Sequence, residues 1–130
     1  MAAIRSYADL DVWQKSMSLV EEVYKFTKAL PPDERFCLVT QMQRAAISIP
    51  SNIAEGHGRR STGAYLNHLS ISYGFLMELE TQIHISCRLN YIDQELLGKL
   101  LNKTSEIGRM LNGLKHSLNP ESRRPTPQPK

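Results

Sequence analysis

The chain has 130 residues, the length of one ordinary domain, and its 41% apolar and 22% charged residues are values typical of a globular protein. No apolar run approaches the roughly 18 residues that a membrane span requires, and the N-terminus lacks the segments of a secretory signal. We therefore expect a cytoplasmic protein without a membrane partner. The net charge is +3, but residues 1–118 carry 13 Lys and Arg against 12 acids, so bulk charge supports nucleic-acid binding only weakly.

Four segments show helical periodicity and are separated by turn residues. Their predicted ranges are 9–29, 33–58, 61–89 and 93–118. Asp9 and either Ser61 or Thr62 are the predicted N-terminal caps. The fourth segment begins at Asp93, and residues 93–95 put negative charge on its first turn. Because the connections are short, consecutive helices become antiparallel neighbours. The sequence thus predicts an all-α, up-down-up-down four-helix bundle over residues 1–118.

The last twelve residues have a different composition. Residues 119–130 contain four prolines and almost no apolar side chain, so they cannot bury enough surface to offset the entropy of ordering. We expect a disordered Pro-rich C-terminal tail. Pro50, by contrast, lies inside the second predicted helix, where it removes a backbone hydrogen bond and predicts a kink near residues 47–51.

The first predicted helix carries two apolar stripes. With a rotation of about 100° per residue, the two stripes lie roughly 130° apart around the helix. One stripe contains Leu10, Trp13, Met17, Val20 and Tyr24, and the other contains Val12, Leu19, Val23, Phe26 and Leu30. A helix on the outside of a monomeric bundle needs only one such face, so the second stripe favours a contact with another subunit. The alternative is one wide face that serves a single core.

Some residues of the predicted core are polar or reactive. Glu80 falls in an apolar stripe of the third helix, and equal counting from the preceding turn places it near Gln41, with Arg44 as a second possible partner. We interpret it as part of a buried structural network rather than a general acid or base. Cys37 and Cys87 lack the spacing of a zinc site and are predicted to be buried free thiols.

Catalytic and metal-binding patterns are weak. The four histidines are far apart in sequence, and none belongs to the Glu-x-x-His repeat by which bundles bind paired iron. No glycine cluster follows a strand as a phosphate-binding loop does. We therefore expect neither an enzyme nor a metal or other cofactor.

Three strings carry a resemblance to a known family. They are Leu10 to Lys15 (LDVWQK), Gln41 to Gly58 (QMQRAAISIPSNIAEGHG) followed by Arg59, and Glu78 to Gln82 (ELETQ). The chain resembles the 23S rRNA intervening-sequence proteins from about Tyr7 to Leu118, although Cys37 stands where that family commonly has a small residue.

The resemblance implies a four-helix bundle that assembles into a ring-shaped homopentamer. It also implies similarity to the accessory protein of diversity-generating retroelements, which partners a reverse transcriptase and binds nucleic acid. It implies no established enzyme activity.

The up-down topology gathers basic residues at one end of the bundle. The predicted nucleic-acid-binding residues are Arg5, His57, Arg59, Arg60, Lys115 and His116, with Arg123 and Arg124 tethered close by. Asp9, Asp11 and Glu55 partly oppose them. An oligomer would multiply this excess of positive charge, and the resemblance favours RNA or DNA as the ligand.

Three functions remain open from the sequence. The first is a non-catalytic oligomeric adaptor that binds nucleic acid, as an accessory factor to a reverse transcriptase or to an rRNA-related process. The second is a protein-interaction scaffold that binds no nucleic acid. The third is a nucleic-acid-processing enzyme, which would need a carboxylate or metal cluster that the sequence does not assemble.

Overall fold

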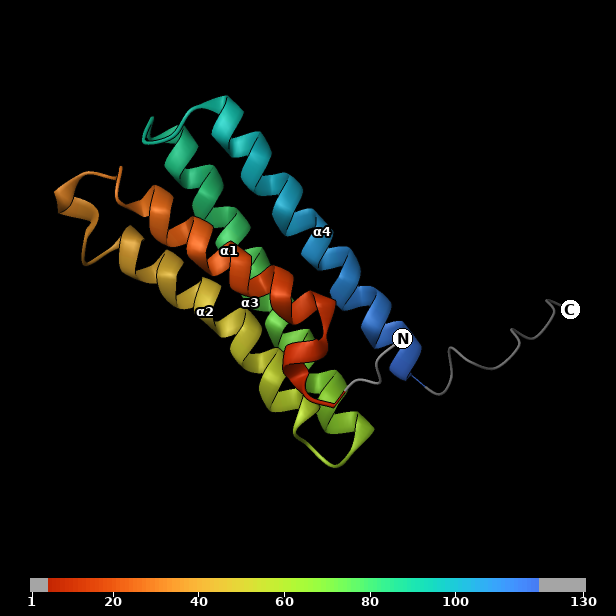
Figure 1. The fold of residues 1–130 in the computed structure, drawn as a ribbon. Helices are drawn as coiled ribbons and strands as arrows, with labels where there is room; N and C mark the ends of the chain where they lie inside the picture. Colours follow the sequence, from red (N-terminus) through yellow and green to blue (C-terminus); the bar gives the residue numbers. More distant parts are fainter. Residues whose placement is uncertain (1–4, 120–130) are drawn as a thin grey trace, which may run out of the picture.

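The helices run alternately in opposite directions along a common axis, as Figure 1 shows for the computed structural model. The structure describes residues 5–119. Within that range the chain forms four α-helices and two short 3-10 helices. The α-helices are α1 (Asp11–Thr27), α2 (Leu38–His57), α3 (Thr62–Arg88) and α4 (Gln94–Leu118). The predicted all-α, up-down-up-down four-helix bundle is confirmed.

The start of the first helix differs from the prediction. A 3-10 helix, η1 (Tyr7–Asp9), precedes α1, and Ser6 rather than Asp9 is its cap. The Ser6 hydroxyl accepts from Ala8 N at 3.2 Å, while Asp9 Oδ2 accepts from Ser6 N at 3.2 Å. Asp9 therefore completes a reciprocal capping box and does not cap the main helix.

The second helix begins later than predicted. Pro32–Glu34 forms the short 3-10 helix η2, and α2 starts only at Leu38, after Cys37. Cys37 is exposed, whereas Cys87 is buried. The prediction of a buried thiol at Cys37 was wrong, because this residue lies in the connection between α1 and α2 and not on a core-facing helical turn.

The third helix is capped by Ser61, one of the two predicted residues, and the fourth helix is capped by Asp93, the residue at which it was predicted to begin. The side chain of Ser61 accepts from Ala64 N at 3.1 Å, and that of Asp93 accepts from Leu96 N at 2.8 Å. Between these helices Asn90 adopts a φ of 64°, a left-handed conformation that asparagine tolerates better than most residues. This residue allows α3 to end and the chain to turn back.

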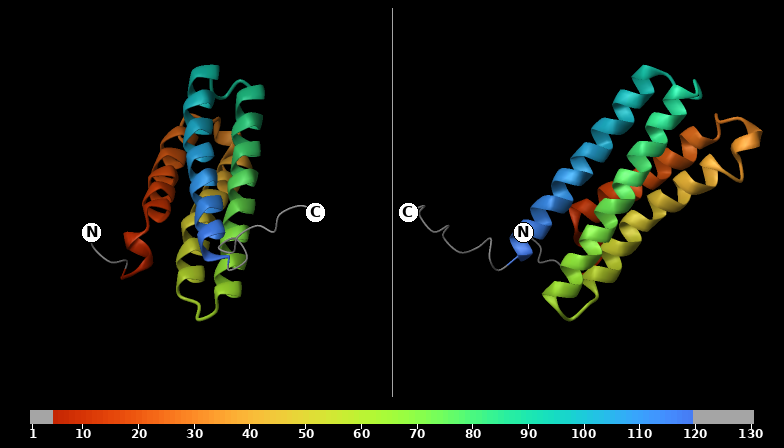
Figure 2. Two further views of the ribbon diagram at one scale, coloured as in Figure 1. Left: turned by 90° about the vertical axis from the view of Figure 1, so that its right-hand side faces the viewer. Right: turned by 180° about the vertical axis from the view of Figure 1, so that it is seen from behind.

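The packing joins each helix to its neighbours around the bundle (Figure 2). The core contains apolar side chains from all four α-helices, among them Leu19, Ile49, Leu76 and Leu111. The Val12 stripe of α1 is buried in this core. Helix α2 is continuous through the buried Pro50, and Ser72 Oγ of α3 donates to Ile49 O beside it at 2.7 Å.

The stripe that begins at Leu10 has a mixed environment. Leu10 is buried and Trp13 and Val20 are half-buried, while Met17 and Tyr24 remain 38% and 40% exposed. The monomer therefore does not bury both stripes in one wide face. In residues 5–119, no helix is long and apolar enough to span a bilayer.

Candidate nucleic-acid interface at the basic end of the bundle

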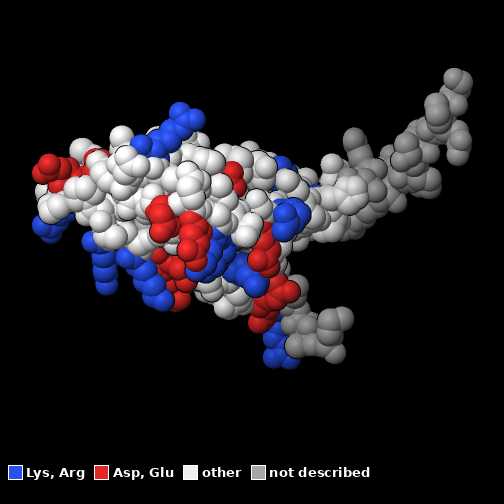
Figure 3. Space-filling view, turned by 90° about the horizontal axis from the view of Figure 1, so that it is seen from above, with Lys and Arg blue, Asp and Glu red and all other residues white. Residues whose placement is uncertain are grey.

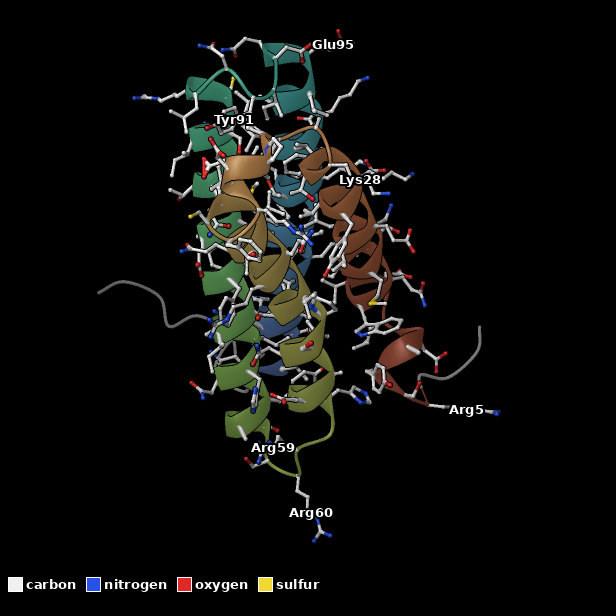
Figure 4. The ribbon with its side chains drawn as sticks, turned by 90° about the vertical axis from the view of Figure 1, so that its left-hand side faces the viewer. Arg5, Lys28, Arg59, Arg60, Tyr91 and Glu95 are labelled. Carbon is white, nitrogen blue, oxygen red and sulfur yellow. The ribbon has the colours of Figure 1, made fainter. Side chains whose placement is uncertain are left out.

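The six predicted binding residues lie toward one end of the bundle but do not form one cluster. This end is built from η1 with the start of α1, the end of α2, the start of α3 and the end of α4. Figure 4 shows Arg59 and Arg60 at the tip of the α2–α3 turn, while Arg5 lies to one side and extends away from them. The end therefore presents separate basic groups, of which the Arg59–Arg60 pair is the most prominent.

Arg59 and Arg60 are held by a short, well-bonded turn. Gly58 N donates to Ala54 O at 3.1 Å and Arg59 N donates to Gly56 O at 3.0 Å, so the end of α2 is closed by its own backbone. Both arginine side chains are exposed. Among the described residues neither guanidinium has an ion pair or a side-chain hydrogen bond, which leaves both groups available to an anionic ligand.

His57 differs from the two arginines in its surroundings. Its ring meets the edge of the Tyr65 ring, with centroids 5.8 Å apart and an interplanar angle of 84°. Burial raises the pKa of Tyr65 above its usual value of 10.0. His57 is half-buried, and it therefore supports the α2–α3 junction as well as contributing to the surface of this end.

The remaining three predicted residues come from the segment before η1 and from the end of α4. The backbone N–H of Arg5 donates to Asp9 Oδ2 at 2.8 Å, which fixes the start of η1. Lys115 is half-buried and His116 is exposed in the last turn of α4, where their carbonyl oxygens accept from Asn119 N. Arg123 and Arg124 lie outside the described residues, as does the predicted tail beyond Asn119.

Acidic side chains near this end reduce its positive charge. Asp9 and Asp11 are exposed at the start of α1, and Glu55 Oε2 lies 3.7 Å from His68 Nδ1. Acidic and basic side chains also lie next to each other on the side of the molecule that Figure 3 shows. The positive charge that is available to an anionic ligand is therefore clearest at the projecting α2–α3 turn.

Glu80 lies elsewhere and has a different partner from the predicted ones. Thr104 Oγ1 of α4 donates to Glu80 Oε2 at 2.7 Å. The carboxylate that lines a surface recess with Gln41 and Arg44 is instead that of Glu78. Counting equal numbers of residues away from the α2–α3 turn predicts the level of a residue along the helix axis, but not the direction in which its side chain points. Glu78 and Glu80 are two residues apart, which corresponds to a rotation of about 200° around the helix. The prediction of Gln41 or Arg44 as the partner of Glu80 was therefore wrong.

Among residues 5–119 there is no group of three or more His, Cys, Asp or Glu side chains placed to bind a metal ion.

A surface groove between α1 and α2 was not predicted from the sequence. It is lined by Tyr7, Trp13, Met17 and Val20 on one side and by Ile47, Pro50, Ser51 and Ala54 on the other. We call it the α1–α2 groove. The Trp13 stripe indicated the first wall, but Ile47, which is 42% exposed, belongs to the second wall only because of how α2 packs against α1.

Comparisons with known proteins agree with this architecture. The family model of the 23S rRNA-intervening sequence protein matches residues 8–113. A solved structure from Bacteroides thetaiotaomicron, described as a protein with unknown function from the S23 ribosomal protein family, is 26% identical in sequence. The alignment covers 80% of this chain and 94% of that one, with a TM-score of 0.74. No match was found among curated proteins.

The matched region contains all four α-helices up to the last turns of α4. It also contains the long central string of α2 and the exposed α2–α3 turn. The chain therefore belongs to the 23S rRNA-intervening sequence protein family.

Proposed function

We propose that this protein is a non-catalytic homo-oligomer, a pentamer as the family resemblance implies, that binds structured RNA or DNA through its basic end. The observation that carries the proposal is the exposed Arg59–Arg60 pair at the projecting α2–α3 turn, whose guanidinium groups are unpaired among the described residues. Such groups suit phosphate oxygens, which accept from arginine in a forked geometry.

The proposed contact is with the nucleic-acid backbone. Phosphate contacts position a protein without reading bases, and their strength grows with the number of charges engaged at once. One subunit offers a modest set of basic groups opposed by Asp9, Asp11 and Glu55. An oligomer that presents several α2–α3 turns together would bind far more tightly than its separate subunits.

Self-association is supported by an exposed apolar surface on α3, separate from the α1–α2 groove. Ile71 and Ile85 of α3 are 39% and 41% exposed, and the half-buried Phe75 lies between them in sequence. We call these three residues the α3 ridge. Exposed apolar side chains aligned on one helix are typical of an interaction surface, and we propose that the ridge is one of the two different surfaces that a closed ring brings together.

The biological setting that we propose is that of an accessory factor. The protein would hold nucleic acid for a reverse transcriptase or for an rRNA-related process, with a stable bundle as the support and the basic turn as the contact. Membership of the 23S rRNA-intervening sequence protein family is consistent with this setting.

The test replaces both arginines by alanine, in the variant Arg59→Ala/Arg60→Ala. We expect it to bind a labelled structured RNA about tenfold or more weakly than the parent at moderate salt, because two phosphate contacts per subunit are lost. The matched control is Lys28→Ala/Arg88→Ala, which removes two exposed positive charges at the ends of α1 and α3, opposite the basic end.

The control should bind like the parent. Equal affinities for the parent and the Arg59/Arg60 variant would contradict the proposal and favour a protein-interaction scaffold that binds no nucleic acid.

A further inference from the structure

The α1–α2 groove is a mostly apolar site with one aromatic wall. The rings of Tyr7 and Trp13 meet with centroids 5.2 Å apart and an interplanar angle of 60°. Pro50 supplies part of the opposite wall, together with the exposed Ile47. Grooves lined with aromatic rings are the surfaces on which proteins bind proline-rich segments, whose restricted backbone loses little entropy on docking.

The chain itself contains such a segment. Residues 120–130 have the sequence PESRRPTPQPK, with prolines at 125, 127 and 129 and with Arg123 and Arg124 directly before them. We propose that the α1–α2 groove is the docking site of this C-terminal segment of the same chain, with residues 125–129 seated against Tyr7 and Trp13.

The point at which the described chain ends favours this occupant. Lys15 Nζ of α1 lies 3.4 Å from Glu106 Oε1 of α4, and Lys103 Nζ of α4 lies 3.2 Å from Glu22 Oε1 of α1. The two helices are thus antiparallel neighbours. Thirteen residues separate Glu106 from Asn119, or about 20 Å of helix. Asn119 therefore lies close to the level of η1, at the end where the groove begins. Figure 1 shows the end of α4 on the same side of the molecule as η1.

The length of the segment is sufficient. The path from the end of α4 to the groove crosses α1, which is about 10–12 Å wide with its side chains. Residues 120–124 span about 15 Å in an extended, proline-type conformation, and all eleven residues of the segment span about 34 Å. Residues 125–129 can therefore reach the Tyr7–Trp13 part of the groove.

Charge along this path is complementary. Asp11 and Lys15 are four residues apart and share the side of α1 that faces α4, because residues at this spacing lie on one helical face. Asp11 is exposed and has no ion pair among the described residues. It lies between the end of α4 and the groove, where it suits Arg123 or Arg124.

The tether favours an intramolecular contact over one between copies. A short flexible connection gives the segment an effective concentration of about a millimolar at its own groove, which is well above the micromolar concentrations used in solution. This inference concerns a surface that the proposed nucleic-acid contact does not use, so either can fail without the other.

The single tryptophan of the chain is a built-in probe. In the full-length variant Pro125→Ala/Pro127→Ala/Pro129→Ala, we expect the fluorescence emission of Trp13 to shift to longer wavelength. The reason is that the indole ring becomes more exposed to water when the C-terminal segment no longer covers it. Adding a synthetic peptide of residues 119–130 should reverse the shift in a saturable way, and a peptide with the same three alanines should not.

Two further variants provide the comparison. Ile47→Ser alters the groove wall and should reproduce the emission shift, whereas Leu89→Ser alters an exposed apolar residue at the end of α3, outside both the groove and the α3 ridge, and should leave Trp13 emission unchanged. Light scattering should show the same mass for the parent and the proline variant.

Unchanged emission in the proline variant would overturn the inference. A lower mass of that variant would also overturn it, because the groove would then be occupied by a second copy of the chain. Loss of RNA binding in the arginine variant tests the proposed function alone.

Discussion

At the scale of single residues, Gly56 determines how closely α2 approaches α3. A Cβ atom at this position would lie 2.7 Å from the Cβ of His68, closer than real Cβ contacts, and 3.1 Å from Cδ1 of Tyr65, which is a tight contact. We therefore expect Gly56→Ala to lower the free energy of unfolding by about 1–3 kcal/mol through overpacking, as measured by urea denaturation.

The control for this prediction is Gly98→Ala. A Cβ atom on Gly98 of α4 meets nothing within 4 Å, so the change should stabilise the helix by up to about 1 kcal/mol. Equal effects of the two substitutions would show that helix propensity, and not the close contact of α2 with α3, determines the result at Gly56.

Glu80 provides a second test at the residue scale. Its carboxylate accepts from Thr104, whose single hydroxyl proton is shared with Leu101 O at 3.1 Å. Because a glutamine carbonyl oxygen can accept the same bond, Glu80→Gln should keep the free energy of unfolding within about 1 kcal/mol of the parent. RNA affinity should not change. Lost RNA binding in an intact oligomer would instead assign Glu80 a functional role.

The connections at the far end of the bundle are joined by one side-chain hydrogen bond. Tyr91, after α3, donates through its hydroxyl to Glu34 Oε2 of η2 at 3.0 Å. This hydrogen bond raises the pKa of Tyr91 above its usual value of 10.0, and desolvation and the charges of Glu34 and Asp33 act in the same direction.

The pH dependence of this link follows from the raised pKa. A group that holds its proton more tightly in the folded state contributes stability that is complete below its unfolded pKa and is lost as pH rises through its folded pKa. The parent should therefore be more stable than Tyr91→Phe at pH 8, and the difference should shrink above pH 10. Urea denaturation of both proteins across this range measures it. A difference that is constant with pH would contradict the role of the hydrogen bond.

The helices were predictable to different degrees, for identifiable reasons. Caps follow from side-chain chemistry that is local in sequence: Ser61 was one of two residues predicted to cap α3, and the start of the fourth helix at Asp93 was predicted correctly. The start of α2 was not, because Cys37 at its N-cap makes no side-chain capping bond and residues 32–34 form a separate 3-10 helix. Local patterns do not reveal where such a connection ends.

The candidate site was predictable in position but not in detail. Alternation of helix direction correctly placed Arg5, His57 and the α2–α3 turn at one end. The same reasoning could not show that His57 packs on Tyr65 or that Arg5 extends to the side. It also missed the α1–α2 groove, because the second wall of a groove depends on the rotation of α2 about its own axis.

Assembly is a property of the whole molecule, and we propose that it uses the α3 ridge. Light scattering of the parent at micromolar concentration should give several times the subunit mass of 14.8 kDa, and five times if the ring is a pentamer. Ile71→Ser/Ile85→Ser should reduce this mass with little change in helical content, because both side chains are substantially exposed. A monomeric parent would contradict self-association, and an unchanged mass in the variant would exclude the ridge as the contact.

The salt dependence of RNA and DNA binding tests the central claim most directly. Each phosphate contact adds about 0.9 to the slope of log affinity against log salt for duplex DNA. The Arg59→Ala/Arg60→Ala variant should therefore show a slope flatter by about 1.8 or more, with a melting temperature close to that of the parent because exposed changes cost within about 0.5 kcal/mol. The slope for Lys28→Ala/Arg88→Ala should match that of the parent. Equal slopes for the parent and the Arg59/Arg60 variant would contradict nucleic-acid binding through the α2–α3 turn.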